Sequence, residues 1–128
     1  MKNNELRIGN YVQHKGEIVK VEQITKHKIG YHKYADKRTM QYLKYSEIVP
    51  IEITEDILIR LGFEETFNDT YSEILRYDKI EVIKFYERLL VHIFNKYSEY
   101  CFGNIIKYIH ELQNAYFVVN NKELEIKF

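Results

Sequence analysis

Residues 71–102 are dense in β-branched and aromatic residues, and polar pairs interrupt them about every nine residues. The interruptions are Asp78-Lys79, Glu87-Arg88 and Asn95-Lys96. Short apolar runs between such breaks are typical of an antiparallel meander. Some apolar residues also fall near helical spacing, so a helix stays an alternative for residues 79–97. We predict strands at about 72–77, 80–86, 89–94 and 97–102.

The first fifty residues also predict short strands. Lys15-Gly16 is a turn signal between strands at residues 10–14 and 17–24. A second hairpin is expected from residues 28–34 and 39–45, and Pro50 closes the region. Four or five short strands in so few residues indicate either a small SH3-like barrel or a bent antiparallel sheet.

A short helix is predicted directly after Pro50. Thr54 is a suitable N-cap, and Glu55 and Asp56 place negative charge in the first turn, where the helix dipole favours it. Gly62 provides the residue that ends the helix. This helix is expected to link the two halves of the chain.

A longer helix is predicted near the C-terminus, and it should cover the meander. Asn104 is its expected N-cap, and Asn120-Asn121 its expected end. The apolar stripe consists of Ile105, Ile109, Leu112 and Tyr116. Residues 124–128 then alternate apolar and charged side chains like a final strand.

Size and composition are typical of one soluble domain, and the predicted strands and helices make it an α+β domain. The 128 residues are 45% hydrophobic, enough for one core, so we expect a single domain with a basic subregion at 1–50 and an acidic subregion at 51–128. Charged residues make up 30%, and no apolar run approaches the roughly 20 residues that span a bilayer. The N-terminus lacks a signal-peptide pattern, so a cytoplasmic location is expected. The lone Cys101 excludes an internal disulfide.

Charge is sorted along the chain although the total is zero. Residues 1–50 hold ten Lys and Arg against five Asp and Glu, and residues 51–128 hold nine against fourteen. The basic excess peaks where cations alternate with tyrosines, at Lys26, Lys28, Tyr31, Lys33, Tyr34, Lys37, Arg38, Tyr42 and Lys44. Such a mixture suits phosphate contact and base stacking, but lysines on an outer sheet face also prevent edge pairing. Strand alternation divides the tyrosines between two faces, which favours the second explanation.

The sequence contains no convincing catalytic or metal-binding pattern. Cys101, His110 and Asn114 are the residue types of a thiol-protease triad, but no Gly-rich oxyanion loop accompanies them. His27 and His32 lack a third ligand at a recognised spacing. Glu64-Glu65 and Asp69 are interpreted as a solvated loop. We therefore expect no enzymatic activity, no cofactor and no metal.

Three stretches of the chain carry a resemblance to known sequences: residues 4–12 (NELRIGNYV), residues 46–63 with the acidic-start helix and Leu61-Gly62-Phe63, and residues 110–117 (HELQNAYF) before Glu123-Leu124. Together they resemble a family of small uncharacterised proteins from gut anaerobic bacteria, their phages and mobile elements. The resemblance implies a single domain and strands rather than helix in 71–102. It implies no activity.

His110, Gln113 and Asn114 form a polar set on an otherwise apolar helix. His110 and Asn114, at i and i+4, could bond each other or a neighbouring strand. The alternative is a small polar pocket to which Arg7 contributes. We predict a non-enzymatic accessory protein of phage or mobile-element type that binds a protein partner or itself, because the two charge halves could be complementary between copies. Nucleic-acid binding through residues 26–45 is the alternative.

Overall fold

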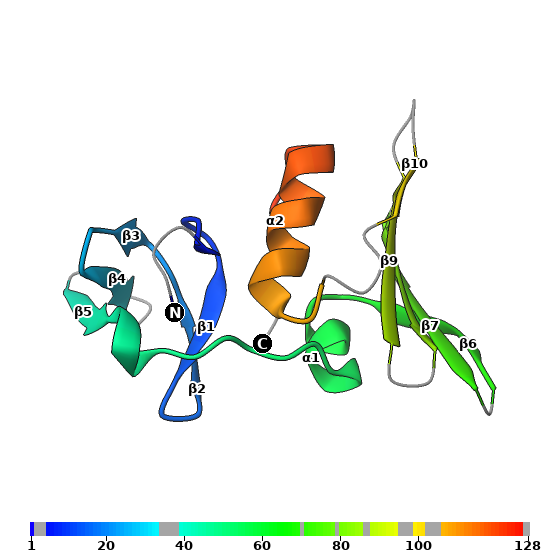
Figure 1. The fold of residues 1–128 in the computed structure, drawn as a ribbon, viewed down its shortest axis with the longest axis horizontal. Coiled ribbons are helices and arrows are strands. Elements are labelled where there is room, and N and C mark those ends of the chain that lie inside the picture. Colours follow the sequence, from blue (N-terminus) through cyan, green and yellow to red (C-terminus); the bar gives the residue numbers. More distant parts are fainter. Residues whose placement is uncertain are drawn as a thin grey trace. The chain divides into compact units, whose positions relative to one another are not determined.

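Three antiparallel sheets and two α-helices make up the described part of the fold, which confirms the predicted α+β class. The structure, a computed structural model, describes residues 1, 5–33, 39–69, 71–78, 80–85, 88–94, 99–101 and 106–126 (Figure 1). Contacts divide the chain into two compact units. Unit 1 comprises Met1–Glu52 and Tyr108–Asn114, and unit 2 comprises Ile53–Lys107 and Ala115–Phe128.

Unit 1 begins with the predicted hairpin. Strands β1 (Tyr11–His14) and β2 (Glu17–Lys20) pair antiparallel. Lys15 and Gly16 both have positive φ, 49° and 79°, as a two-residue hairpin turn requires. Gly16 adopts this conformation without steric cost, since it has no Cβ.

The second sheet of unit 1 has the order β3-β4-β5, from β3 (Gln23–Ile24), β4 (Lys28–His32) and β5 (Met40–Lys44). The predicted pairing of β4 with β5 is confirmed, while the connection at 34–38 lies outside the described residues. A 3-10 turn, η2 (Tyr45–Glu47), follows β5.

The single strand predicted at 17–24 is wrong, because the chain passes there from one sheet to the other. The Val21 N–H donates to the Asn10 carbonyl, and the Glu22 N–H donates to the Gly30 carbonyl. Neighbouring residues thus have partners in different segments, which ends β2 and starts β3. Both sheets of unit 1 are open within the described residues, and an SH3-like closure stays a prediction.

One apolar core lies between these strands. It consists of Leu6, Val12, Val19, Val21, Ile29, Leu43 and Ile48. The inward residues of both sheets contribute to it, so the two small sheets stabilise each other rather than standing alone.

Helix α1 (Glu55–Arg60) opens unit 2 and is capped as predicted. Thr54 Oγ1 accepts the Ile57 N–H at 3.3 Å. Gly62 ends the helix with φ of 97°, and the Phe63 N–H returns to the Leu58 carbonyl.

The main sheet of unit 2 is a five-stranded meander, β10-β9-β8-β7-β6. The strands are β6 (Glu64–Asn68), β7 (Ser72–Tyr77), β8 (Ile80–Phe85), β9 (Arg88–Phe94) and β10 (Glu99–Cys101). Strands rather than helix in this region are thereby confirmed. The predicted loop at Glu64-Glu65 is wrong, because both residues belong to β6, an edge strand whose side chains are all exposed.

The inner face of this sheet is buried. Leu75, Val82 and Val91 stand opposite one another on β7, β8 and β9, and all three are nearly inaccessible to solvent. Figure 1 shows α1 beside the sheet, and Leu58 of α1 lines a small cavity together with Leu75 and Val82. The helix therefore covers this inner face.

Helix α2 (Ile109–Asn120) starts later than the predicted Asn104 and Ile105. Residues 102–105 lie outside the described residues, but Tyr108 forms a bridge with Glu52, which keeps the chain extended up to the helix. Glu111 Oε1 accepts the Tyr108 N–H at 3.0 Å, as the third residue of a capping box does. Asn121, with φ of 53°, ends the helix as predicted.

The last described residues bury apolar side chains without forming a strand. Leu124 and Ile126 are buried and Glu125 is exposed, so the predicted alternation is present. Residues 122–126 are not part of a strand, and 127–128 lie outside the described residues. Tyr116 attaches the second half of α2 to unit 2, because its hydroxyl donates to Asp78 Oδ2 at 2.9 Å. No helix within the described ranges is long and apolar enough to cross a membrane.

Candidate binding surfaces

The basic segment of unit 1 is only partly brought together. Lys26, Lys28, Lys33, Tyr42 and Lys44 are exposed, whereas Tyr34, Lys37 and Arg38 lie outside the described residues. The register pairs Lys28 with Lys44 and Gly30 with Tyr42, so these residues share one face of the sheet. We call Lys28, Tyr42 and Lys44 the basic strand face.

Tyr31 lies on the opposite face of this sheet. It packs against the core of unit 1, and its hydroxyl donates to Gln41 Oε1 at 3.2 Å. On the basic strand face, the Lys28 ammonium lies 4.8 Å from the centre of the Tyr42 ring. Tyr42 is 46% exposed, and a base that stacks on the ring face near Lys28 would compete with this cation–π contact.

Among the described residues, neither of the two histidines near this face belongs to a group of three possible metal ligands. His32 Nδ1 pairs with the Glu22 carboxylate. His27 is exposed in the turn before β4. His32 is therefore paired within the protein, and His27 faces solvent.

Gln113 joins α2 to the segment before β1. Its Oε1 accepts the Tyr11 N–H at 2.9 Å, and its Nε2 donates to the Gly9 carbonyl at 3.0 Å. The side chain is fully buried. Both ends of the amide are thus used within the protein, as burial of a polar group requires.

Asn114 completes this network with two residues near the N-terminus. Its Oδ1 accepts from Asn10 Nδ2 at 2.8 Å and from Arg7 Nε at 3.2 Å. The Arg7 N–H in turn donates to Asn10 Oδ1 at 2.7 Å. The pocket proposed for Gln113, Asn114 and Arg7 is filled by these mutual contacts, and Asn10 is a member that the sequence did not reveal.

His110 stands apart from the network, so the hydrogen bond expected with Asn114 does not form. Its ring is 4% exposed and stacks on Tyr108, with 5.9 Å between the ring centres. Nδ1 is buried without a hydrogen-bond partner among the described residues. Burial lowers the pKa of His110, although Glu111 and Glu5 oppose this shift. The side chain of Cys101, the other key member of the rejected triad, lies outside the described residues.

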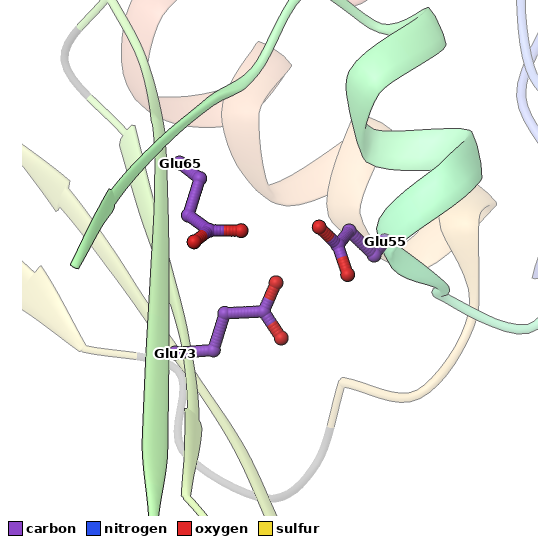
Figure 2. Close-up of side chains that lie close together, drawn as sticks. All are labelled: Glu55, Glu65 and Glu73. Carbon is purple, nitrogen blue, oxygen red and sulfur yellow. The ribbon is translucent and has the colours of Figure 1, made fainter. Parts of the chain in front are cut away.

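Three carboxylates converge in unit 2. Glu55 from α1, Glu65 from β6 and Glu73 from β7 each place an oxygen within 4.8 Å of the others (Figure 2). Glu73, and more weakly Glu65, raise the pKa of Glu55, because neighbouring negative charges disfavour its ionised form. Glu73 Oε1 is buried without a hydrogen-bond partner in the described part of the chain.

Within the described ranges, these three glutamates are the group of side chains that could hold a hard cation. Carboxylate oxygens are the ligands of Ca²⁺ and Mg²⁺, but Ca²⁺ usually collects at least six oxygens. Among the described residues no fourth His, Cys, Asp or Glu joins the group. The sequence did not reveal the cluster, because its members come from three elements.

The outer face of the unit 2 sheet carries apolar side chains in one row. Phe67 stands opposite Ile74, and Ile74 stands opposite Ile83. Phe67 is 48% exposed, and both isoleucines are half-buried. We call Phe67, Ile74 and Ile83 the outer apolar row.

A charged row lies beside the outer apolar row. Arg76 stands opposite both Glu64 and Glu81, and its guanidinium is 3.8 Å from the Glu81 carboxylate. Arg76 and Glu64 also line an open hollow of about 390 Å³ with Gly62, Thr66, Tyr77 and Asp78. The outer face thus combines an apolar strip with a rim of both charge signs.

The surfaces differ in how many side chains remain accessible to a ligand. The network around Gln113 is closed on itself, whereas the basic strand face and the outer apolar row expose side chains that another molecule could contact. No protein-family model, curated protein or solved structure matches this chain.

Proposed function

We propose that the protein is a non-catalytic interaction protein that binds another protein surface through the outer apolar row. The observation that carries the proposal is the register of Phe67, Ile74 and Ile83, which sets three apolar side chains side by side across three strands. The opposite face of the same strands already supplies the core of unit 2. An apolar strip that the core does not need is typical of an interaction site.

Phe67 is the expected anchor of this surface. It is 48% exposed at the edge of the sheet, and aromatic side chains dominate the energetics of protein interfaces. Covering an exposed apolar surface gains roughly 25 cal/mol per Å². The half-buried isoleucines beside it would extend the contact at little entropic cost, because their rotamers are already restricted.

The non-catalytic part of the proposal rests on His110. It is the histidine that the sequence associated with catalysis, and it is 4% exposed beside Tyr108. A general base must reach its substrate within hydrogen-bond distance, which this position does not favour. The phage or mobile-element setting implied by the family resemblance stays a prediction.

A crosslinking experiment in living cells tests the proposal. Tagged wild-type protein is compared with Phe67→Lys, which puts a charge into the row, and with the control Ile59→Lys. Ile59 is 54% exposed on α1, so the control changes a similarly exposed apolar residue outside the row. We expect the crosslinked products of the wild type and the control to be absent with Phe67→Lys. Identical products from all three proteins would contradict the proposal.

Nucleic-acid binding is the second candidate, and the basic strand face favours it. Lys28 and Lys44 flank an exposed Tyr42, which provides two phosphate contacts and one stacking ring. It ranks second because Tyr31 lies on the other face and Lys28 already covers the Tyr42 ring. Gel shifts at low salt with single- and double-stranded DNA and RNA test it, with Lys28→Glu/Lys44→Glu as the variant and Lys122→Glu as the control. Absence of any shift with the wild type would exclude this candidate.

A further inference from the structure

We infer that the occupant of the outer apolar row is a second copy of this chain, related to the first by a two-fold axis. The inference rests on the proposed function, because it names the partner of the same surface. It is carried by two observations: the charges of the rim, and the form of the sheet edge next to Phe67.

The rim of the outer apolar row is self-complementary. Arg76 carries a cation whose side chain is 53% exposed, and Glu64 and Glu81 stand on either side of it. In a two-fold interface every residue meets its counterparts from an identical surface, so a rim of one sign would repel its own copy. A rim with both signs allows Arg76 of one copy to meet Glu81 or Glu64 of the other.

The sheet edge next to the outer apolar row does not favour a competing mode of association. Strand β6, which carries Phe67, is one of the two edge strands of this sheet, and its register shifts between Glu65 and Phe67. An irregular edge with exposed acidic side chains disfavours strand-to-strand pairing with another chain. Two apolar sheet faces, in contrast, can stack at the usual spacing of about 10 Å.

Sedimentation velocity on the purified full chain tests the inference over a wide range of protein concentration. We expect the wild type and Ile59→Lys to form a dimer, and Phe67→Lys to weaken dimerisation at least about tenfold, which corresponds to about 1.4 kcal/mol. Arg76→Glu and Glu81→Arg should each weaken the dimer. The double variant Arg76→Glu/Glu81→Arg should restore it, because the rim again carries both signs.

The outcomes separate this inference from the proposed function. A wild type that stays monomeric at every concentration, or a dimer that Phe67→Lys leaves unchanged, overturns the second-copy inference. The proposed function survives either result if Phe67→Lys still abolishes crosslinked products in cells. If Phe67→Lys does not fold, as judged by circular dichroism, amide hydrogen exchange of the wild type replaces it. Protection in β6 and β7 that grows with protein concentration supports the inference, and protection independent of concentration overturns it.

Discussion

Asn10 Nδ2 donates a 2.8 Å hydrogen bond to Asn114 Oδ1, although 104 positions separate the two residues. Beside this pair, Gln113 bonds the backbone of Gly9 and Tyr11. The start of β1 and the segment before it are therefore held to the first half of α2 by specific polar contacts. Buried polar networks of this kind fix one arrangement, because a shift of register leaves several groups unpaired.

Replacing Gln113 with Ala should destabilise the protein by about 2–5 kcal/mol. The substitution removes the acceptor of the Tyr11 N–H and the donor to the Gly9 carbonyl, and it leaves a cavity at a fully buried site. Urea unfolding measures the loss, with the exposed Lys122→Gln as the control. A loss below about 0.5 kcal/mol, the usual range for surface substitutions, would show that the network does not hold the fold.

Acid should destabilise the protein through His110. Burial lowers the pKa of its imidazole below the ordinary value of 6.5, so the unfolded chain binds the proton first. Protonation of His110 therefore does not reduce the free energy of unfolding above about pH 6.5. As the pH drops from there towards the lowered pKa, the free energy of unfolding falls by at most about 1.4 kcal/mol per pH unit. Urea titrations at a series of pH values give the slope.

Two histidine variants identify the group responsible for that slope. His110→Phe keeps an aromatic ring against Tyr108 but cannot titrate, so the decline between pH 6.5 and pH 5 should become shallower. His27→Gln, which replaces an exposed histidine, is the matched control. Equal slopes for the wild type and His110→Phe would show that His110 accepts its proton as easily in the folded as in the unfolded state.

Capping and turn residues in the sequence were sufficient to predict helix α1 and the first hairpin. Thr54, the acidic first turn and Gly62 define α1 without help from the rest of the chain. Lys15-Gly16 likewise determines the first hairpin. Strand β6 was missed because all its side chains are exposed, and only its hydrogen bonds to β7 make it a strand.

Distant contacts explain the remaining differences between sequence and structure. The start of α2 depends on the Ile109 N–H donating to the Ile51 carbonyl, a partner that helical periodicity cannot reveal. Gln113 was recognised as a polar residue on an apolar stripe, but its backbone partners follow from the tertiary structure. The outer apolar row combines residues from three strands, so it appears only when the register of the sheet is known.

Removing one carboxylate from the glutamate cluster should stabilise the protein at neutral pH. Glu73 and Glu65 raise the pKa of Glu55, so the folded chain binds a proton more tightly than the unfolded chain. Above the raised pKa this repulsion opposes folding, and it is relieved as the pH falls to the ordinary value of 4.5. Glu73→Gln should therefore raise the melting temperature at pH 7, and the difference from the wild type should disappear in acid.

Glu64→Gln is the matched control for the cluster. Glu64 is on β6 next to Glu65, but it stands opposite Arg76 on the outer face. Neutralising Glu64 removes an attraction to Arg76 and leaves the repulsion among the three clustered glutamates unchanged. The melting temperature at pH 7 should therefore stay the same or fall. An increase equal to that of Glu73→Gln would show that general negative charge, rather than this cluster, opposes folding.

Two adjacent substitutions on β7 should differ sharply in cost, since their side chains lie on opposite faces of the sheet. Leu75 is 2% exposed on the inner face, and Leu75→Ala should destabilise by about 2–5 kcal/mol. Ile74 is half-buried in the outer apolar row, and Ile74→Ala should cost no more than about 1 kcal/mol. Urea unfolding at low protein concentration measures both without a contribution from association. Equal losses at that concentration would mean that the chain itself covers the outer face, leaving no apolar surface for a second copy to bind.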